Sequence, residues 1–265
     1  MDILERIVAD KRAEVAAAKA AVPEASLRER LAAATKPLPF REALAASPHG
    51  IIAEFKRKSP SRGWIHADVE PGQVVPKYAA AGAAAVSILT DEPYFGGCLD
   101  YVVKMRPLVN VPILRKEFVI DRYQLVEARA AGADAVLLIA SCLDRDTFRF
   151  LLDEAHQLGL QVLLEVHTIE ELDYVTPEVD AVGVNNRHLG TFHTDVEVSF
   201  RMVEELCRRG LGGPGGPVLV SESGISKPET VRRLRAEGFR GFLMGECFMK
   251  EDDPGAALAA FIDAL

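Results

Sequence analysis

Short runs of apolar residues recur along the chain from Ile51 onward, separated by stretches rich in Ala, Leu and charged residues. Each run has the length and composition of a buried β-strand, and each intervening stretch has the character of a helix. Successive runs begin about 20 to 35 residues apart, the spacing of a strand, a loop, a helix and a return turn. The eight runs begin at Ile51, Ala84, Val111, Ala135, Gln161, Ala181, Pro217 and Gly241. The pattern therefore predicts an α/β fold, a (β/α)8 TIM barrel.

Glycines at the ends of the intervening stretches support this prediction. Gly82, Gly132 and Gly238 stand where a helix should end before the next strand. The main alternative is a doubly wound open sheet. In that fold a GxGxxG sequence would follow the first strand, yet neither this motif nor a Gly-rich Lys-Ser/Thr loop occurs. We therefore favour the closed barrel.

The beginning of the chain has a different pattern. Residues 2–22 are predicted to form an amphipathic helix with its apolar side chains on one side, and Pro23 ends it. A second helix is predicted for residues 26–34. We expect residues 1–48 to form a helical extension and residues 49–265 to form the barrel, within one domain.

Composition and charge narrow the function. The length of 265 residues suits one barrel, and 49% hydrophobic with 26% charged residues is ordinary for a globular protein. Lys and Arg number 31 against 39 Asp and Glu, so the net charge is −8. A general attraction to nucleic acid or anionic lipid is therefore not expected, and an anionic ligand must be captured locally.

Two further features indicate the compartment and the chemistry. The first residues contain acids and lack a continuous apolar run, so we expect neither a secretory signal nor a membrane span, and a cytoplasmic location follows. The four cysteines have no paired spacing, which argues against a metal site and a disulfide scaffold. They are Cys98, Cys142, Cys207 and Cys247. No obvious apolar seam suggests more than a monomer.

Charged and amide side chains occur in the runs on faces that should be apolar. Alternation along a strand directs Glu54 and Lys56 to one face of the first run, and the other face of that run is wholly apolar. The same argument directs Lys116, Glu165 and Asn185 inward near the ends of three other strands. These residues should therefore lie at the carboxyl-terminal mouth of the barrel, where barrel enzymes have their active sites.

Buried charges at one mouth suggest proton transfer. Any one of them alone could be an interior ion pair that only fixes the barrel registry. Several at the same end instead favour a site in which pKa values are shifted for catalysis. A lysine whose charged form is disfavoured by neighbouring cations can donate a proton near neutral pH, and a carboxylate in a partly apolar pocket can act as a base.

The turns after the last two strands suggest an anion site. Ser221-Glu222-Ser223-Gly224 and Leu243-Met244-Gly245-Glu246 place small residues where backbone must approach a ligand, and in barrels these loops often bind phosphate. Glycine for a tight turn is the alternative. The basic loop at residues 57–64 could cover a phosphate, although a solvated loop would have the same composition. Phe95 and Phe118 follow two strands and would form an apolar wall.

Several motifs in order along the chain carry a family resemblance. From Ile51 to about Met249, IIAEFKRKSPSRG, LTDEPYFGG, PILRKEF, GADAVLLIA, LLEVHT, GVNNRHL, SESGI and GFLMGECFM resemble the indole-3-glycerol-phosphate synthase family. The helical extension is also similar. The resemblance implies a lyase of tryptophan biosynthesis that closes the indole ring of 1-(2-carboxyphenylamino)-1-deoxyribulose 5-phosphate with loss of CO2 and water. It also implies that neither a metal nor an organic cofactor is needed.

The resemblance also implies roles for residues. Lys116 is expected to be the general acid and Glu165 the acid or base of the dehydration. Lys56 contacts substrate anions, Glu54 and Asn185 orient the reacting groups, and Glu222 is a further carboxylate of the site. Phosphate-side contacts are expected from Ser59, Ser223, Gly224, Gly245 and Glu246. The remaining expected substrate contacts are Pro60, Phe95, Phe118, Leu137, Arg187, Leu189 and Leu243.

Three positions depart from the family pattern: Glu117 stands where Asp is usual, His188 where Asp or Asn is usual, and Glu246 where a small residue also occurs. A carboxylate at 246 would repel phosphate unless it turned away. Two alternatives stay open: isomerisation of phosphoribosyl anthranilate, which would not need the set of Lys116, Glu165 and Asn185, and a non-catalytic phosphosugar-binding protein on the same fold.

Overall fold

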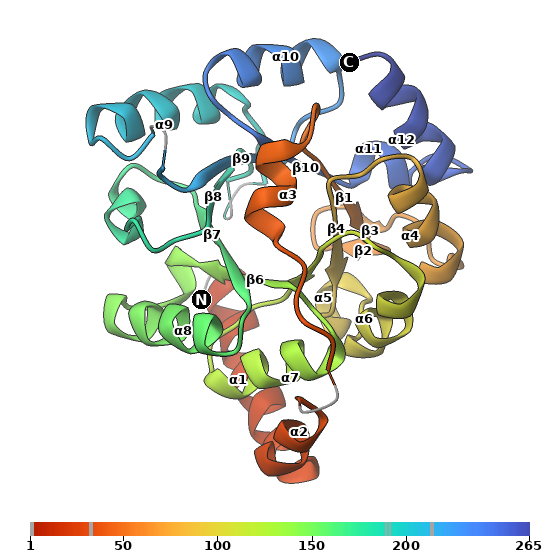
Figure 1. The fold of residues 1–265 in the computed structure, drawn as a ribbon, viewed down its shortest axis with the longest axis vertical. Coiled ribbons are helices and arrows are strands. Elements are labelled where there is room, and N and C mark those ends of the chain that lie inside the picture. The colour runs from red at the N-terminus through yellow and green to blue at the C-terminus, as the bar shows by residue number, and fades with distance from the viewer. Residues whose placement is uncertain (1–2, 32–33, 189, 191, 213–214) are drawn as a thin grey trace.

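Eight parallel strands close into a barrel in the computed structural model, which describes residues 3–31, 34–188, 190, 192–212 and 215–265 (Figure 1). Closure is seen at Ile52, which pairs with Ala85 on one side and with Leu243 on the other. The strands are β1 (Ile51–Phe55), β4 (Ala85–Leu89), β5 (Ile113–Lys116), β6 (Ala135–Ile139), β7 (Gln161–Val166), β8 (Ala181–Asn185), β9 (Val218–Glu222) and β10 (Gly241–Met244). The predicted TIM barrel and all eight predicted strands are confirmed.

Helices surround the barrel and bury the outer faces of its strands (Figure 1). Ile51, Ala53 and Phe55 pack in this outer core, as the alternation in β1 predicts. Gly82, Gly132 and Gly238 adopt left-handed φ values where helices end, also as predicted. The barrel helices are α4 (Pro71–Ala80), α5 (Glu92–Phe95), α6 (Leu99–Met105), η1 (Arg106–Leu108), α7 (Arg122–Ala131), η2 (Ala140–Cys142), α8 (Arg145–Gln157), η3 (Glu170–Tyr174), α9 (Glu197–Arg208), α10 (Pro228–Ala236), α11 (Glu246–Met249) and α12 (Pro254–Asp263).

The loop after β1 contains a short hairpin that the sequence did not predict. Its strands are β2 (Lys58–Ser59) and β3 (Gly63–Trp64), paired antiparallel. The guanidinium of Arg57 lies 5.5 Å from the centre of the Trp64 ring, which is half exposed. Strands of two residues are too short for an alternating pattern, so the sequence could not reveal them.

Three helices precede the barrel. The predicted helices at residues 2–22 and 26–34 correspond to α1 (Ile3–Ala21) and α2 (Glu24–Leu31), although Asp2, residue 32 and residue 33 lie outside the described residues. A third helix, α3 (Phe40–Ala46), was not predicted. Its Phe40 and Leu44 are fully buried in the cluster that fills the barrel interior.

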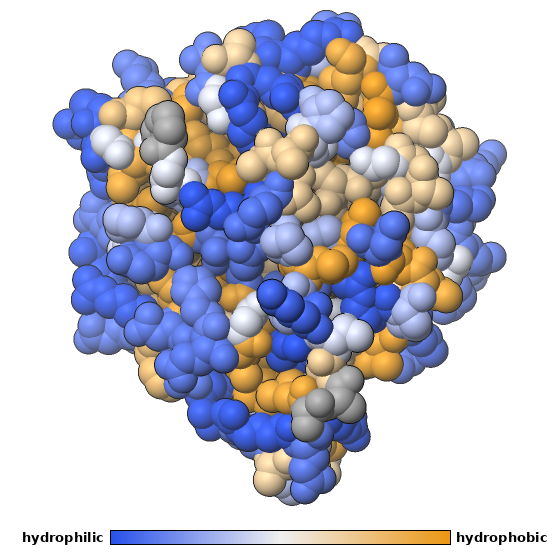
Figure 2. Space-filling model, in the orientation of Figure 1, coloured by the Kyte–Doolittle hydropathy of each residue, from blue (hydrophilic) through white to orange (hydrophobic). Residues whose placement is uncertain are grey.

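The position of α3 explains how the lower end of the barrel is closed. It crosses the middle of the barrel in Figure 1, and its apolar residues pack against Ile52, Leu114 and the first residues of several strands. Hydrophilic residues cover much of this face of the molecule, with hydrophobic residues in separate patches among them (Figure 2). The helix therefore seals the end opposite the strand-end charges.

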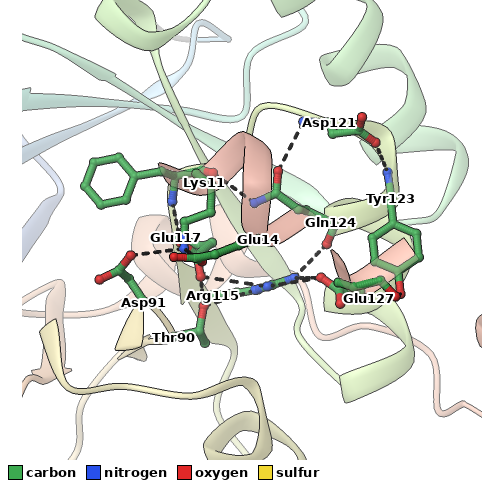
Figure 3. A network of polar contacts seen from close by, with 12 residues as sticks. Lys11, Glu14, Thr90, Asp91, Arg115, Glu117, Asp121, Tyr123, Gln124 and Glu127 are labelled. Atoms are coloured by element: carbon green, nitrogen blue, oxygen red, sulfur yellow. Dashed lines mark hydrogen bonds and ion pairs between the residues drawn. The ribbon is translucent and has the colours of Figure 1, made fainter. Parts of the chain in front are cut away.

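Helix α1 is attached to the barrel mouth through a buried lysine (Figure 3). The Lys11 Nζ lies 3.0 Å from a carboxylate oxygen of Asp91 and 3.0 Å from one of Glu117, and its side chain is 5% exposed. Glu117 also accepts a hydrogen bond from Thr90 Oγ1 at 2.7 Å, beside Arg115. This network joins the extension to the ends of β4 and β5.

Replacing Lys11 by Met should destabilise the protein strongly. The change leaves the buried carboxylates of Asp91 and Glu117 without their shared cation, which is expected to lower the free energy of unfolding by about 3 kcal/mol. Urea unfolding measures this loss. Lys19→Met on the same helix is the matched control, because its pair with Asp121 is largely exposed and should contribute about 1 kcal/mol or less. Equal losses in both variants would contradict the role assigned to Lys11.

Candidate active site

A cavity of about 390 Å³ opens at the carboxyl-terminal mouth of the barrel. Glu222 is nearly fully buried and contacts Lys116 at the cavity, whereas Leu189 lies outside the described residues. The residues named from the sequence that line the cavity are Glu54, Lys56, Ser59, Pro60, Phe95, Lys116, Phe118, Leu137, Glu165, Asn185, Arg187, Ser223, Gly224, Leu243, Gly245 and Glu246. The structure thus brings together around one cavity the described residues that were singled out.

Lys116 is the centre of the charged cluster. Its Nζ lies 2.5 Å from Glu222 Oε2 and 3.2 Å from Glu165 Oε2. Asn185 Nδ2 donates a hydrogen bond to the other oxygen of Glu165 at 3.1 Å. Four strand ends, on β5, β7, β8 and β9, therefore supply one connected polar group, and their alternation directs each of these side chains inward.

A second pair lies on β1 and the residue after it. Lys56 Nζ is 2.5 Å from Glu54 Oε1, and Glu54 is 2% exposed. Gly245 faces this pair from the end of β10: a Cβ there would lie 2.6 Å from Glu54 Oε1. The absence of a side chain at Gly245 therefore provides the space that Glu54 occupies.

Gly183 on β8 makes the corresponding space for Glu222. An added Cβ would lie 2.0 Å from Glu222 Oε1, and Leu163 is also close. This oxygen of Glu222 is buried and has no hydrogen-bond partner, so the carboxyl group is held by Lys116 on one side only. The position of Glu222 thus depends on the absence of a side chain at Gly183.

Replacing Gly183 by Ala should displace the Glu222 carboxyl group from Lys116. Because a misplacement of about 1 Å in an active site can cost about 100-fold in rate, we expect kcat to fall by about that factor. Gly72→Ala in α4 is the matched control, since its added Cβ would meet its nearest neighbour at an ordinary 3.8 Å. Steady-state kinetics on both variants, with melting curves, checks this. Wild-type kcat in the Gly183 variant would show that Glu222 does not need this position.

The opposite side of the mouth is formed by the ends of β9 and β10. Ser223 and Gly224 have left-handed φ values of 68° and 76°, and a Cβ on Gly224 would lie 2.5 Å from Thr194 Cγ2. A non-glycine residue in this conformation is strained, and Asn186 supports it by donating to the Ser223 carbonyl oxygen at 3.1 Å. The chain therefore maintains a strained turn at the place where the sequence suggested an anion site.

Glu246 is neutralised by two arginines. Its carboxylate oxygens lie 3.0 Å from Arg62 and 3.2 Å from Arg187, and Arg187 also donates to Ser61 Oγ at 3.0 Å. The repulsion of a phosphate expected from a bare carboxylate is therefore reduced. These contacts join the loops that follow β1, β8 and β10.

An apolar wall completes the cavity. The rings of Phe95 and Phe118 are 6.0 Å apart, and Leu4 and Ile7 of α1 also line the cavity. The backbone N–H of Phe95 donates to Asp91, the same residue that pairs with Lys11. The extension is therefore part of the site as well as of the fold, which the sequence reading did not predict.

Comparison with solved structures shows the same fold. A mutant tryptophan synthase alpha-subunit from Pyrococcus furiosus superposes with a TM-score of 0.58 at 16% identity, over 82% of this chain and 97% of that chain. At this identity the likeness concerns the fold alone.

Comparison of sequences decides the family. The indole-3-glycerol phosphate synthase family model matches residues 4–261. The indole-3-glycerol phosphate synthase of Bacteroides thetaiotaomicron is 53% identical over 264 residues, covering 100% of this chain and 99% of that protein. That of Laribacter hongkongensis is 43% identical, over 97% of this chain and 98% of that protein. The chain belongs to the indole-3-glycerol phosphate synthase family.

Membership in the indole-3-glycerol phosphate synthase family confirms the enzyme class and the place in tryptophan biosynthesis that the motifs predicted. The substrate class, a phosphorylated small molecule, is also that of this family. Among the described residues, no helix is long and apolar enough to cross a membrane, and no group of three His, Cys, Asp or Glu side chains is arranged to hold a metal ion.

The charged groups around Lys116 are not the cations that the sequence analysis suggested. Burial alone would lower the pKa of Lys116, but the carboxylates of Glu222, Glu165 and Glu54 outweigh it and raise the pKa. The hypothesis that neighbouring cations disfavour its charged form is therefore wrong. It failed because Glu222 is 106 residues away in sequence, so its approach to Lys116 depends on barrel closure.

The pKa values of Glu222 and Glu165 are shifted in opposite directions. Burial, with repulsion from Glu165 and Glu54, raises the pKa of Glu222 to about 7 despite the contact with Lys116. Burial would raise the pKa of Glu165 too, but Lys116 and His167 outweigh it and lower the pKa well below the ordinary range. One glutamate is therefore ionised at neutral pH, while another can hold a proton near neutrality.

His167 is a residue of the site that sequence reasoning missed. Its side chain is 8% exposed and lies within 3.4 Å of carboxylates on both sides. The available signal was its spacing: two residues after Glu165 along an extended segment, its side chain lies on the same side of the chain as that of Glu165.

Proposed function

We propose that the barrel mouth closes the indole ring of 1-(2-carboxyphenylamino)-1-deoxyribulose 5-phosphate to give indole-3-glycerol phosphate, with loss of CO2 and water. The observation that carries this proposal is the position of Lys116 between Glu165 and Glu222 inside a cavity with an apolar wall on one side. A buried ammonium group aimed into such a cavity can donate a proton to a substrate carbonyl oxygen.

Lys116 acts in the first half of the reaction. As the aromatic ring carbon attacks the ribulose carbonyl carbon, the ammonium group of Lys116 donates its proton to the carbonyl oxygen, which becomes a hydroxyl group. The substrate carboxylate then leaves as CO2, and its bonding electrons restore the ring. Glu222, with its pKa near 7, stays close enough to return a proton to Lys116.

Glu165 acts in the dehydration that follows. Its carboxylate removes the proton whose loss forms the new double bond, while the hydroxyl group accepts a proton from Lys116, which Glu222 has reprotonated, and leaves as water. Asn185 holds the second oxygen of Glu165 and so fixes the orientation of the carboxylate. Lys56, paired with Glu54, is positioned to contact a substrate anion.

The two ends of the substrate require different surroundings. The carboxyphenyl ring suits the wall of Phe95, Phe118, Pro60 and Leu137, and Arg187 supplies a cation for the carboxylate. The phosphate suits the turns at Ser223, Gly224 and Gly245, with Ser59 and Leu243 nearby, and Glu246 acts through its arginine pairs instead of contacting phosphate. The cavity volume lies in the range of small-molecule sites.

We also propose that the 265 residues act as one monomeric domain in the cytoplasm, with residues 1–48 as the extension of a barrel at 49–265. The contacts of α1 with the barrel mouth support a single domain. The four cysteines are all thiols, which suits a reducing compartment.

A substrate-choice experiment tests this function. The purified protein is offered 1-(2-carboxyphenylamino)-1-deoxyribulose 5-phosphate and, separately, phosphoribosyl anthranilate. We expect the fluorescence of an indole product to appear with the former and no consumption of the latter. Turnover of phosphoribosyl anthranilate alone would establish an isomerase, and binding without turnover of either compound would establish a phosphosugar-binding protein.

A further inference from the structure

His167 lies directly behind Glu165, outside the lining of the cavity. It follows β7, and its ring Nε2 is 3.2 Å from Glu165 Oε1. On the other side of the ring, Nδ1 is 3.4 Å from Glu171 Oε2. The same oxygen of Glu171, on η3, accepts a hydrogen bond from the backbone N–H of His167 at 2.6 Å. The imidazole ring is thus held between two carboxylates in a buried position.

This geometry determines the protonation of the ring. A neutral imidazole has one N–H group and one nitrogen lone pair. In the neutral form, one lone pair of His167 would face a carboxylate at close range in a buried environment, which is unfavourable. The doubly protonated ring instead places a positive charge within 3.4 Å of each carboxylate. Burial would lower the pKa of His167, but Glu165 and Glu171 outweigh it and raise the pKa to about 9.

We propose that His167, held as an imidazolium between Glu165 and Glu171, is a positioning residue that keeps Glu165 ionised and oriented for dehydration. The proposal rests on the role of Glu165 in the proposed function. His167 does not contact the substrate. It acts through Glu165.

Glu165 needs a second cation beside it because Lys116 loses its charge during the reaction. Lys116 and His167 are the cations that lower the pKa of Glu165, whereas Glu222 and Glu54 are further acids of the same buried cluster. Whenever Lys116 gives its proton to the substrate, it becomes neutral, and until Glu222 returns a proton to it Lys116 no longer stabilises the Glu165 carboxylate. His167 keeps its charge throughout, since its own partner Glu171 lies away from the cavity. Glu165 therefore remains a base when it is required.

His167→Gln tests the proposal through the pH dependence of kcat. Removal of the imidazolium raises the pKa of Glu165 in the dehydration step, in which Lys116 gives up its proton and His167 is the cation left beside this carboxylate. The carboxylate is then lost at a higher pH, and the acid limb of the profile moves upward. We expect a shift of about 1 pH unit and a roughly tenfold fall in kcat below that limb, with KM changed less than about twofold because the residue lies outside the cavity.

His156→Gln is the matched control. His156 on α8 also pairs with a carboxylate, Asp180, at 2.9 Å, but Asp180 directly precedes β8 at the opposite end of the barrel. This variant should keep the wild-type profile. A His167→Gln enzyme that also keeps the wild-type acid limb would overturn the proposal, as would a fall in kcat that is equal at all pH values.

Two further measurements keep the test decisive. If His167→Gln does not fold, Glu171→Gln retains the ring and should move the acid limb in the same direction by a smaller amount; an unmoved limb counts against the proposal.

Independently of any activity, the 15N chemical shifts of the His167 ring should report two protonated nitrogens at pH 7.5. A neutral tautomer at that pH would overturn the proposal even if the proposed function is correct. The chemical shifts can be measured whether or not the substrate assay shows turnover, so the two failures can be distinguished.

Discussion

Replacing Lys116 by Met is expected to reduce kcat by about 1000-fold while leaving the protein folded and able to bind substrate. Methionine has nearly the length of lysine but no proton to donate, so the attack on the carbonyl carbon loses its general acid and its electrostatic stabilisation. The loss of the cation leaves Glu222 and Glu165 facing each other. Because the pKa of Glu222 is already raised, protonation of Glu222 can relieve this repulsion.

The measurement for the Lys116 variant is steady-state turnover followed by indole fluorescence, with substrate binding measured separately at equilibrium. Lys104→Met is the matched control: it removes an exposed lysine on α6 that pairs with Asp100, and it should retain wild-type kcat. If Lys116→Met turned over at more than about a tenth of the wild-type rate, the proposed acid would be wrong.

Replacing Glu165 by Gln should stop the reaction at a later point. Glutamine keeps the size of the side chain and can still interact with Asn185, but it cannot accept the proton that the dehydration removes. We expect kcat to fall by about 1000-fold, while CO2 release in a single turnover remains faster than indole formation. The decarboxylated, ring-closed intermediate should therefore accumulate.

Rapid quenching of a single turnover, with separate assays of CO2 and of the indole product, checks this order. Glu170→Gln is the control, since Glu170 is the exposed first residue of η3 and does not line the cavity. Equal slowing of CO2 release and indole formation in the Glu165 variant would instead assign Glu165 to the ring closure.

The barrel and its strand-end side chains could be predicted from the sequence because they depend on local periodicity. Alternation along a strand fixes which residues point inward, so Glu54, Lys116 and Glu165 could be identified without coordinates. The assignment of roles required more: several motifs in order, and a family resemblance that the comparisons confirm.

Features that depend on long-range packing could not be predicted. The seven residues of α3 form about two helical turns, too few to give a clear helical pattern in the sequence. Their place under the barrel follows from the burial of Phe40 and Leu44. The placement of α1 at the mouth depends on Lys11 meeting Asp91 and Glu117 from far along the chain.

Two departures from the family pattern now have structural explanations. Glu117 contacts Lys11 and Thr90 at the same time, so its carboxylate anchors the extension directly beside Lys116. His188 accepts a hydrogen bond at its Nδ1 from the backbone N–H of Gly190 at 3.1 Å, and its own N–H donates to the His193 carbonyl oxygen. It therefore takes part in the turn that follows β8.

The stoichiometry of the wild-type reaction tests the central claim most directly. The protein is supplied with a known amount of 1-(2-carboxyphenylamino)-1-deoxyribulose 5-phosphate, and the CO2 released and the indole product formed are both quantified at completion. Decarboxylative ring closure at the barrel mouth predicts equal molar amounts of CO2 and indole-3-glycerol phosphate, without any added metal or cofactor. Consumption of the substrate without CO2, or CO2 without an indole product, would contradict it.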